Sequence, residues 1–480
     1  MKILFFTEAG NNIGYGHIAR CFSLYQAFEL KGFHPQIIVK SDVDLQHIVP
    51  EGNLYIFDWT NNSSELKNVI ELADIAIFDS YLAAPNHILE LAKEVKTPVF
   101  IDDFQRMTYS KGLVLNGAIS AEKLSYPKNE NIKYLLGASF QPIRKEFWNC
   151  PSHSINTHVT KIFITVGGND IHGILPKLIT NLNQLLPNSK LEVVCGDNSE
   201  LEKWAEQQSD TEISVHTNLS ASEMKSLMQK CDIAVSAAGQ TLYELAATGL
   251  PTIGFSVADN QNINLKGWTD NGFILNAGIC TESDFIDKIG NCVHIIRSFD
   301  FRQKASICGK QIINGEGGVS TVNNILRYHI KKHIQLQKAR ETDVEDIYSL
   351  SNEPSVRANS FNQKVIEYQS HVEWYQKKIA DPLCLYLVAF VGQIFAGQVR
   401  YQVEGDSALI GVSIERNFRG YALGEIIVSN SCDLLKKNYP YVKEIVAYVK
   451  KENPASGKMF LKAGYIQIYN PESLEYRLTF

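Results

Sequence analysis

The stretch KILFFT at residues 2–7 opens the chain, and the stretch NNIGYGHIAR follows it at residues 11–20. The first is a short apolar run typical of a buried strand. The second combines glycines and polar residues with the start of a helical pattern. We therefore predict a strand over residues 2–7, a helix over residues 18–31 and a turn between them that can approach a ligand.

The alternation of strand and helix continues along the chain. Short runs rich in Ile, Val and Phe alternate with stretches of helical periodicity, which is the pattern of βαβ units and a parallel sheet. It restarts after Pro142 and the polar stretch 151–158, so we predict two α/β halves, residues 1–150 and 151–333. The further expected strands are 36–40, 75–78, 99–102, 161–166, 190–195, 233–235 and 251–255, and the expected helices are 174–186, 221–230, 241–248, 282–298 and 319–332.

The pattern changes beyond His333, after a basic, amphipathic segment at residues 327–340. Residues 334–480 are expected to form an α+β domain with a mostly antiparallel sheet, because helices precede hairpin-like strands. Its expected helices are 343–350, 365–378, 424–437 and 455–462, and its expected strands are 385–391, 394–401, 408–414, 444–449 and a last pair. Three domains also agree with 480 residues at about 150 per domain.

Composition limits the functional classes. The chain is 45% hydrophobic and 20% charged, which excludes a disordered protein. Its 46 Lys and Arg against 52 Asp and Glu give a formal net charge of -6, and without a long basic stripe we expect no nucleic-acid partner. We expect a cytoplasmic protein, since no signal peptide or membrane span is visible. The 9 Cys never form a C-x-x-C pair, which favours reduced thiols.

The turn at residues 11–20 is the first candidate site. In an open parallel sheet, ligands bind outside the carboxyl ends of the strands, and Gly14 and Gly16 would let the backbone approach one. His17 at the helix start is a candidate general base, because a neutral imidazole can accept a proton from water. The alternative is that the two glycines only form a tight turn that His17 caps.

A second candidate site lies in the second half. Residues 236–251 follow an apolar strand and open a helix whose first amides, near Gly239 and Thr241, can stabilise a diphosphate. Glu244, one turn further, could accept hydrogen bonds from a ribose diol, and Gly168 belongs to another glycine-containing turn. The alternative is a helix of small residues that simply packs on the sheet. The spacing favours a nucleotide-diphosphate site.

Residues 1 to about 330 resemble the UDP-2,4-diacetamido-2,4,6-trideoxy-β-L-altropyranose hydrolases of pseudaminic acid biosynthesis, relatives of the GT-B glycosyltransferases. The matching motifs are residues 14–21, 78–81, 101–103, Arg144 with Glu146 and Phe147, 167–170, 239–251 and 259–261. The resemblance implies two Rossmann-like halves in a GT-B arrangement, His17 as the base, and a sugar pocket lined by Asn260 and Gln261. The full expected substrate-binding set is Gly14, Gly16, Arg20, Asp79, Tyr81, Asp103, Arg144, Gly168, Asn169, Gly239, Gln240, Thr241, Glu244, Asn260 and Gln261.

The expected chemistry is hydrolysis. Water deprotonated by His17 would attack the anomeric carbon while the helix start at residues 239–241 stabilises the departing UDP. His17 with Asp79 or Asp103 could form a metal site, but we expect a reaction without a metal because the helix terminus already supplies positive potential. Asp79, Asp103 and Tyr81 are expected to orient His17 or a sugar hydroxyl, or else to cap turns.

The last domain holds another candidate site. Residues 410–414 are an expected strand, and residues 416–424 are a turn whose successive amides can bind a pyrophosphate. The turn resembles the R-x-x-G-x-G/A loop of the GNAT acyltransferases, with Ala422 where that family usually has Gly. We expect Ala422 to adopt ordinary helical angles. The expected acetyl-CoA-binding set is Val412, Ile414, Arg419, Gly420, Tyr421, Ala422, Leu423, Gly424, Asn453, Ser456 and Phe460.

Two features of this domain are left open. Phe460 stands where many GNAT enzymes have a proton-donating Tyr, so Ser456, Tyr448 or a solvent path would have to protonate the departing CoA thiolate. The attacking amine would lie between Ile414 and Val446. His371 and Trp374 lie one helical turn apart and face the same way. We expect Trp374 in the core, whereas His371 could line a pocket or close the core.

The two resemblances together predict a bifunctional enzyme. Residues 337–480 look most like acetyltransferases of nucleotide-linked 4-amino sugars, whose product would be the substrate of the amino-terminal hydrolase. The expected partners are a UDP-linked amino sugar and acetyl-CoA. Two alternatives remain: a GT-B glycosyltransferase that uses an acceptor alcohol, and a last domain that binds acyl-CoA only to regulate the first.

Overall fold

The computed structural model describes residues 1–10, 13–45, 52–61, 66–196, 199–208, 212–469 and 474–480, so Asn11 and Asn12 of the first turn lie outside the described residues. The chain divides into two compact units. One is Lys2–Val322, and the other is Asn323–Phe480 with Met1. The expected mixed α/β fold with parallel sheets is confirmed in the first unit, which contains two such sheets.

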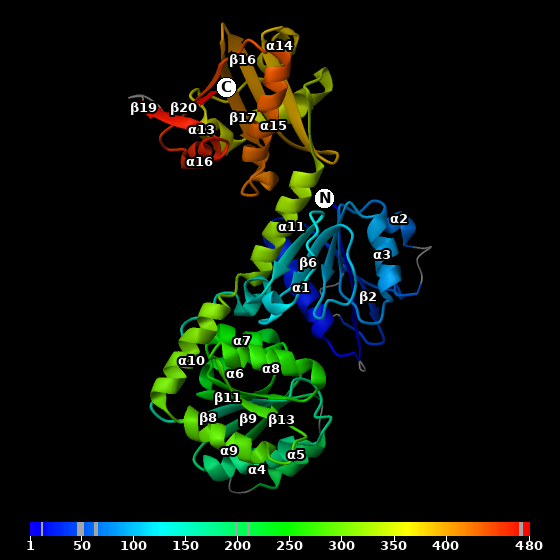
Figure 1. Cartoon of the computed structure of the whole chain (residues 1–480), viewed down its shortest axis with the longest axis vertical. Helices are drawn as coiled ribbons and strands as arrows, with labels where there is room; N and C mark the ends of the chain where they lie inside the picture. The colour runs from blue at the N-terminus through cyan, green and yellow to red at the C-terminus, as the bar shows by residue number, and fades with distance from the viewer. Residues whose placement is uncertain (11–12, 46–51, 62–65, 197–198, 209–211, 470–473) are drawn as a thin grey trace. The chain divides into compact units, whose positions relative to one another are not determined.

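The first sheet is parallel, with strand order β3-β2-β1-β4-β5-β6-β7. Figure 1 shows α1 on one side of this sheet and α3 on the other. Alternate side chains of the central strand pack against these opposite layers. Phe5 contacts Phe28 of α1 with ring centroids 6.2 Å apart, whereas Leu4 and Phe6 belong to the core that includes residues of α2 and α3. The elements are β1 (Ile3–Ala9), α1 (Gly16–Leu30), β2 (Gln36–Ser41), β3 (Leu54–Ile56), α2 (Lys67–Ile70), β4 (Ile75–Phe78), α3 (Pro85–Lys93), β5 (Thr97–Ile101), β6 (Gly112–Asn116) and β7 (Ile132–Leu136).

The second sheet repeats this arrangement with strand order β10-β9-β8-β11-β12-β13, again parallel. Its core joins the strands to α4 and α9 through buried residues such as Leu178 and Ile289. The elements are β8 (Lys161–Thr165), α4 (Leu175–Leu185), β9 (Lys190–Cys195), α5 (Ser199–Glu206), β10 (Ile213–Thr217), α6 (Ala221–Lys230), β11 (Ile233–Ala237), α7 (Thr241–Thr248), β12 (Thr252–Ser256), α8 (Asn262–Asp270), β13 (Ile274–Ile279), α9 (Phe285–Ile296), α10 (Phe299–Ile312) and α11 (Gly317–His333).

The second unit contains a seven-stranded sheet in the order β14-β15-β16-β17-β18-β20-β19. Neighbouring strands are antiparallel except β17 and β18, which confirms the expected mostly antiparallel sheet. The segment 327–340 is part helix and part strand, since α11 ends at His333 and β14 begins at Ile334. The elements are β14 (Ile334–Lys338), α12 (Val344–Asn352), α13 (Pro354–Asn359), α14 (Tyr368–Ala380), β15 (Cys384–Val391), β16 (Ile394–Glu404), β17 (Ser407–Ile414), α15 (Leu423–Asn438), β18 (Glu444–Val449), α16 (Pro454–Lys462), β19 (Ile466–Tyr469) and β20 (Leu474–Thr479).

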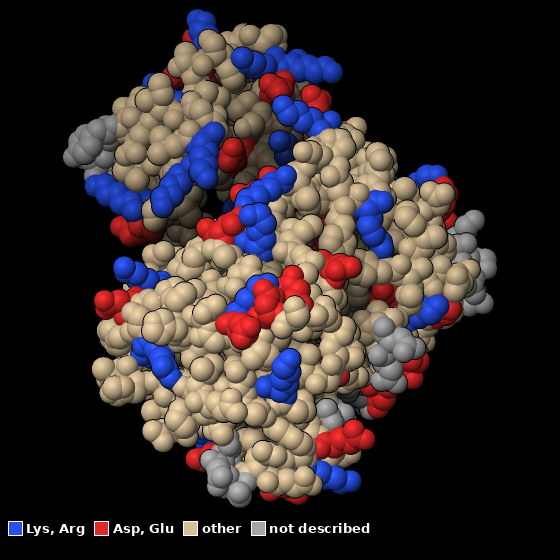
Figure 2. Space-filling model, turned by 60° about the horizontal axis from the view of Figure 1, so that its bottom comes forward, with Lys and Arg blue, Asp and Glu red and all other residues tan. Residues whose placement is uncertain are grey.

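Surface charge is mixed in sign. Figure 2 shows Lys and Arg interspersed with Asp and Glu on the face that it draws. Among the described residues, no helix combines the length and the apolar character that crossing a membrane requires.

Candidate functional site

The topology of the first sheet creates a place for a ligand. β1 and β4 are neighbours where the strand order reverses, and ligands of open α/β sheets bind at the carboxyl ends of strands at such a point. β1 leads through Gly14 to His17 in the first turn of α1, and β4 leads to Asp79. The fold therefore brings His17 and Asp79 together although 62 positions separate them.

A carboxylate holds the His17 imidazole. Nδ1 of His17 lies 2.7 Å from Oδ1 of Asp79, and His17 is 7% exposed. Burial alone raises the pKa of Asp79, but the charges of Arg20 and His17 bring it well below its ordinary value of 3.8, so this carboxylate is ionised. An ionised carboxylate only accepts hydrogen bonds, so in the neutral ring this shorter contact favours a proton on Nδ1 and a lone pair on Nε2, although Nη2 of Arg20 also lies 3.2 Å from Nδ1. This is the tautomer that a general base at Nε2 needs.

Arg20 joins Asp79 to Asp103. Its Nε and Nη2 each donate to Asp79 at 2.6 Å, and its Nη1 donates to both oxygens of Asp103 at 2.8 and 2.9 Å. Burial lowers the pKa of Arg20, but Asp103 and Asp79 raise it well above its ordinary value, so the guanidinium stays charged. Asp79 thus contacts His17 directly, whereas Asp103 is connected to it through Arg20 and through Tyr81.

Tyr81 completes the surroundings of the imidazole. Its ring meets His17 edge-on with centroids 4.5 Å apart, and its hydroxyl donates to Asp103. Burial and the charge of Asp103 raise the pKa of Tyr81 well above its ordinary value. Tyr81 therefore remains a neutral hydrogen-bond donor, and part of it faces solvent because the residue is 42% exposed.

Glu8 belongs to this cluster and was missed from the sequence. It is completely buried near the end of β1, where its carboxylate accepts hydrogen bonds from the amides of Tyr81 and Leu82. Its Oε1 lies 3.8 Å from Nε2 of His17. The signal that could have found it is an acidic residue two positions after the apolar run 3–6, in the expected first strand's extension. An acid is almost never fully buried without partners, so such a position indicates a polar cluster.

The second sheet offers an equivalent position. β8 and β11 are neighbours where its strand order reverses, so the loops that leave them lie at one edge. The loop after β11 starts α7 at Thr241, and no side chain caps that helix start. Its first amides can therefore bind an anion. The loop after β8 contains Gly168 and Asn169, both exposed, and Gly168 accepts a backbone hydrogen bond from Gly196.

Glu244 of α7 is paired with Arg144. Nε and Nη2 of Arg144 donate to the two carboxylate oxygens at 2.6 and 2.7 Å. Burial lowers the pKa of Arg144, but the charge of Glu244 raises it above its ordinary value, so the ion pair persists. A ribose diol at Glu244 would therefore share these oxygens with Arg144.

The other expected residues of this half are only partly brought together. Nε2 of Gln261 lies 3.8 Å from where a Cβ at Gly239 would be, while Asn260 is exposed on the 3₁₀ turn Asp259–Gln261. Gln240 accepts a hydrogen bond from Gln141. Asn264, missed from the sequence, donates to the carbonyl of Ala238 at 2.7 Å and so helps to hold the loop before α7.

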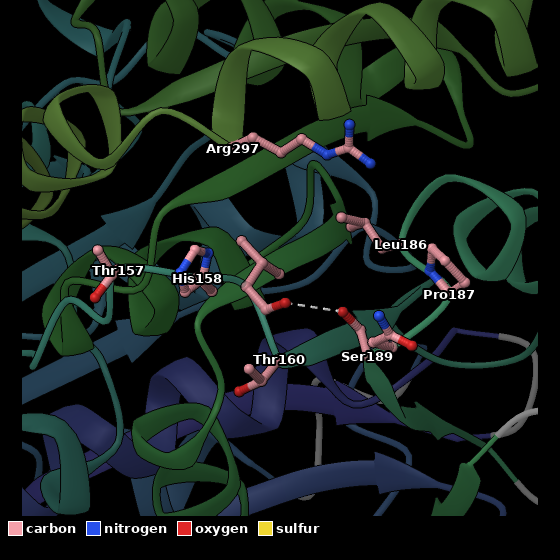
Figure 3. Close-up of a pocket in the computed structure, with 9 residues that line it drawn as sticks. Thr157, His158, Thr160, Leu186, Pro187, Ser189 and Arg297 are labelled. Atoms are coloured by element: carbon pink, nitrogen blue, oxygen red, sulfur yellow. Dashed lines mark hydrogen bonds between the residues drawn. The ribbon is translucent and has the colours of Figure 1, made fainter.

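A cavity of about 390 Å³ lies elsewhere in this half. Its lining comes from residues 157–160 and 186–189, directly before β8 and β9, together with Arg297 (Figure 3). It therefore lies at the amino ends of these strands, opposite the loops that carry Gly168 and Gly239. The nine lining residues include none of the expected site residues.

In the second unit, β17 and β18 diverge. Residues 407–409 of β17 pair with residues 444–446 of β18, and the pairing ends there. Val412 and Ile414 therefore lie beyond the part of β17 that pairs with β18. The loop after β17 then passes through the 3₁₀ turn η6 (Arg416–Phe418) into α15. A gap between strands and a helix start lie next to each other here, which suits a ligand with an extended arm and a pyrophosphate.

The expectation that Ala422 has helical angles is wrong. Ala422 has φ 61° and ψ 15°, in the left-handed region, and it supplies no side-chain cap to α15. The turn from η6 into α15 needs positive φ at residues 420 and 422, and only the first is a glycine. The left-handed region costs a non-glycine residue about 1–2 kcal/mol. Tyr421 and Leu423 are buried, so only their backbone can face a ligand.

The Arg419 side chain is engaged within the protein. Its guanidinium donates to both carboxylate oxygens of Glu353, to Ser355 and to the carbonyl of Ile414. Burial raises the pKa of Glu353, but its hydrogen bonds with Arg419 and Ser355 bring it below its ordinary value. In this structure, Arg419 therefore braces the loop against the start of α13.

The residues expected on α16 have structural contacts. Asn453 caps the helix by accepting from the Ser456 amide at 3.2 Å, and it donates to the Ser456 hydroxyl at 2.9 Å. Phe460 is 3% exposed and packs between Tyr465 and Tyr476. Tyr448 is exposed. Asn453 and Ser456 are thus brought together, whereas the Phe460 ring lies in the core.

The structure exposes Trp374, which was expected in the core, and buries His371. Trp374 is 37% exposed under the guanidinium of Arg400, which lies 4.9 Å from its ring centre, so its expected core position is wrong. His371 is 2% exposed, and burial and the charge of Arg357 lower its pKa. The two rings remain neighbours, with centroids 5.7 Å apart.

Within the described part of the chain, no group of three or more His, Cys, Asp and Glu side chains is arranged to hold a metal ion. Asp79 and Asp103, considered above as metal ligands beside His17, instead bind Arg20.

Comparison with known proteins identifies the last domain. Residues 333–466 match the acetyltransferase (GNAT) domain model, so the chain carries a GNAT acetyltransferase domain, for which acetyl-CoA is the expected co-substrate. A spermidine N-acetyltransferase from Vibrio cholerae in complex with CoA and spermine is 16% identical, over 31% of this chain and 95% of that chain, with a TM-score of 0.29.

Two relatives match more of the chain. The pseudaminic acid cytidylyltransferase and UDP-2,4-diacetamido-2,4,6-trideoxy-β-L-altropyranose hydrolase of Helicobacter pylori is 26% identical over 271 residues, which cover 56% of this chain and 47% of that protein. The chain thus spans about half the length of this relative. An uncharacterised protein of Methanocaldococcus jannaschii is 22% identical over 97% of this chain and 96% of its own length.

Proposed function

We propose that this chain catalyses two consecutive steps on one nucleotide sugar. Its GNAT domain acetylates the 4-amine of UDP-4-amino-4,6-dideoxy-β-L-AltNAc, and its α/β unit then hydrolyses the resulting UDP-2,4-diacetamido-2,4,6-trideoxy-β-L-altropyranose to UDP and free sugar. The match of residues 333–466 supports the first step, and the similarity to the Helicobacter pylori protein supports the second.

The observation that carries the hydrolytic step is the His17–Asp79 pair. Nε2 of His17 has a free lone pair at the point where ligands of such sheets bind. In the proposed step, Nε2 takes a proton from water as the water oxygen bonds to the anomeric carbon. The anomeric C–O bond breaks, and its electron pair leaves with the UDP phosphate oxygen.

The second half would hold the UDP. The amides at the start of α7, near Gly239 and Thr241, suit the diphosphate charge, and the paired Arg144 and Glu244 provide polar contacts for the ribose. We propose a GT-B arrangement, in which residues 1–150 supply the base and residues 151–333 supply the nucleotide site. Gln261 and Asn260 would then contact the sugar.

The acetyl transfer would use the loop of residues 419–424. Its amides bind the pyrophosphate of acetyl-CoA, and the thioester lies where β17 and β18 diverge. The neutral amine attacks the thioester carbon, the C–S bond breaks, and CoA leaves as a thiolate. The nitrogen gives up one proton as the new C–N bond forms. Phe460 has no acidic proton to donate, so Ser456 or solvent relays a proton from the nitrogen to the thiolate.

A product analysis tests both steps. The full chain is incubated with the UDP-4-amino sugar, with and without acetyl-CoA, and the products are identified by mass spectrometry. We expect an acetylated sugar and UDP only when acetyl-CoA is present. The His17→Ala variant is the matched control, and it should accumulate the acetylated UDP-sugar without releasing UDP. Absence of acetylation in the native chain would rule out the first step.

Two rival functions make different predictions. A glycosyltransferase would release no UDP from the diacetamido UDP-sugar unless an acceptor alcohol is added, whereas a hydrolase releases UDP and reducing sugar in equal amounts. A regulatory domain that only binds acyl-CoA is suggested by the engaged Arg419 and the strained Ala422. Acetylated sugar formed by the compact unit 323–480 alone would eliminate this second rival.

A further inference from the structure

Glu8 is a fully buried acid whose charge the proposed reaction does not yet use. Its Oε1 accepts from the Tyr81 amide at 2.7 Å, and its Oε2 accepts from the Leu82 amide at 3.1 Å and from the Ser80 hydroxyl. Three donors thus hold the two oxygens of this carboxylate in place. A buried carboxylate therefore lies at the end of β1.

This carboxylate faces the reactive edge of His17. Oε1 of Glu8 lies 3.8 Å from Nε2, while Asp79 contacts Nδ1 on the opposite edge of the ring at 2.7 Å. The imidazole thus lies between two carboxylates. Among the described residues, the other charged or titratable groups around it include Arg20, which is bound to Asp79 and Asp103, and Tyr81. Cys21 lies on Asp79, and Arg106 lies over the Tyr81 ring.

The negative side chains of the cluster outnumber the positive ones when His17 is neutral. Three acidic side chains belong to the cluster: Glu8, Asp79 and Asp103. Two cations accompany them. Arg20 binds two of these carboxylates, and Arg106 belongs to the cluster because it donates to the carbonyl of Ser80. A neutral His17 leaves one negative charge uncompensated, and an imidazolium balances it.

We propose that Glu8 is a positioning residue of the hydrolytic site, which stabilises the His17 imidazolium at Nε2 and holds the 80–82 turn so that Tyr81 stays against the ring. The inference rests on the proposed hydrolysis, in which the water O–H bond breaks and an Nε2–H bond forms. Glu8 itself gains and loses no proton. It acts through His17 and touches no reacting atom.

The test is a pH titration of the His17 ring by ¹H–¹⁵N NMR of the full, histidine-labelled chain, with the His17→Gln variant identifying its signal. In Glu8→Gln we expect His17 to take up its second proton about 1 pH unit lower than in the native chain, since an opposite charge within 4–6 Å is removed. Ser80→Ala is the matched control. It removes a hydrogen bond to the same carboxylate but keeps the charge, so its titration should match the native one.

The outcomes separate charge from loop support. Equal titrations in Glu8→Gln and the native chain would overturn the stabilising role, and a shift of the same size in Ser80→Ala would assign the effect to the loop. If Glu8→Gln does not fold, Glu8→Asp is the deciding variant, because its carboxylate lies one methylene further from His17. The pH at which His17 takes up its second proton should then fall, by less than is expected for Glu8→Gln. An unchanged titration in that variant also overturns the proposal.

Kinetics give an independent readout. For UDP release, Glu8→Gln should lower kcat by about tenfold or more with KM nearly unchanged, and the acidic limb of the kcat/KM profile should lie at lower pH. If the native chain releases no UDP, the proposed hydrolysis fails, while the NMR titration still judges the effect of Glu8 on His17.

Discussion

The Nδ1 edge of His17 is held by a carboxylate far away in the sequence. Its Nδ1 can be bound by Asp79 because β1 and β4 are adjacent, and this bond leaves Nε2 free for water. A histidine with the same position but without that partner would populate both tautomers. The catalytic potential of His17 therefore depends on Asp79 as much as on the ring itself.

The first prediction concerns this pair. His17→Ala should lower the turnover of UDP release at least ~100-fold, with UDP affinity by calorimetry changed less than about threefold, because only the base is removed. Asp79→Asn is the companion variant, and it should also be slow because an amide can stabilise the wrong tautomer. Full activity of His17→Ala would refute its assignment as the base.

A second prediction concerns the backbone at Ala422. Ala422→Gly should raise the free energy of unfolding by about 0.5 kcal/mol, since relief of a left-handed alanine, about 1–2 kcal/mol, exceeds the extra entropy that glycine loses, about 0.5–1 kcal/mol. Gly420→Ala is the matched control, because φ there is 84° and a Cβ would meet no atom within 4 Å. Its effect in urea unfolding should have the opposite sign.

At the level of elements, Arg419 connects the loop before α15 to the start of α13. If this contact with Glu353 is what positions the amides for acetyl-CoA, Arg419→Ala and Glu353→Ala should each raise the KM for acetyl-CoA by about tenfold, or about 1.4 kcal/mol. The double variant should be no worse than either single one. A Glu353→Ala variant with native KM beside a defective Arg419→Ala would show that Arg419 binds the cofactor directly.

Asp232 also connects separate segments of the chain, at the amino ends of the strands of the second sheet. Its buried carboxylate accepts from Asn156, from the Thr160 hydroxyl and from the amides of Thr160 and Lys161 just where β8 begins. Burial raises the pKa of Asp232, but these hydrogen bonds bring it below its ordinary value of 3.8. The folded state therefore holds this group ionised more strongly than the unfolded chain does.

This arrangement predicts a pH dependence of stability. The contribution of Asp232 is fully present above pH 3.8 and is lost as pH falls further, because the unfolded chain then binds the proton more readily than the folded one. Asp232→Asn should destabilise the unit at pH 7, by about 1–3 kcal/mol in urea unfolding. Its deficit relative to the native chain should shrink at pH 3, and a deficit independent of pH would contradict the assignment.

Element prediction succeeded where periodicity is strong. The strands 75–78, 190–195 and 444–449 and the helices 221–230 and 241–248 agree with the structure at both ends. The strands that were not predicted are β3, β6, β7, β10, β13 and β14. Of these, β3 and β14 are short and only half-buried or exposed, with little hydrophobic alternation of their own. Both are strands because a neighbouring strand supplies their hydrogen bonds, which is long-range information.

At the scale of the whole molecule, the two compact units predict ligand-specific stabilities. At a concentration of 100 times its Kd, a ligand stabilises the unit that binds it by about 2.7 kcal/mol. Differential scanning calorimetry should resolve separate transitions, one raised by several degrees with acetyl-CoA and another with UDP. Removal of either ligand by dialysis should reverse its shift. A single transition raised by both ligands would contradict this assignment to separate units.

Local sequence was sufficient for some features of the candidate sites. Gly14, His17, Gly239 and the turn at 416–424 could be identified because each follows an apolar strand and opens a helix, and that pattern is complete within about fifteen residues. The partners of these residues could not. Glu8 beside His17, Arg144 on Glu244 and Glu353 on Arg419 are joined only when distant segments pack together.

The alternation of strands and helices, the change of fold class after His333 and the glycine turns at strand ends were thus determined by the sequence alone, because each depends on hydrophobic spacing along a short stretch. Only the tertiary structure decided which nitrogen of His17 is free, that Ala422 lies in the left-handed region and that Trp374 is exposed while His371 is buried. Tautomer, backbone strain and burial follow from which groups surround a residue, and the neighbours come from strands and helices far apart in the chain.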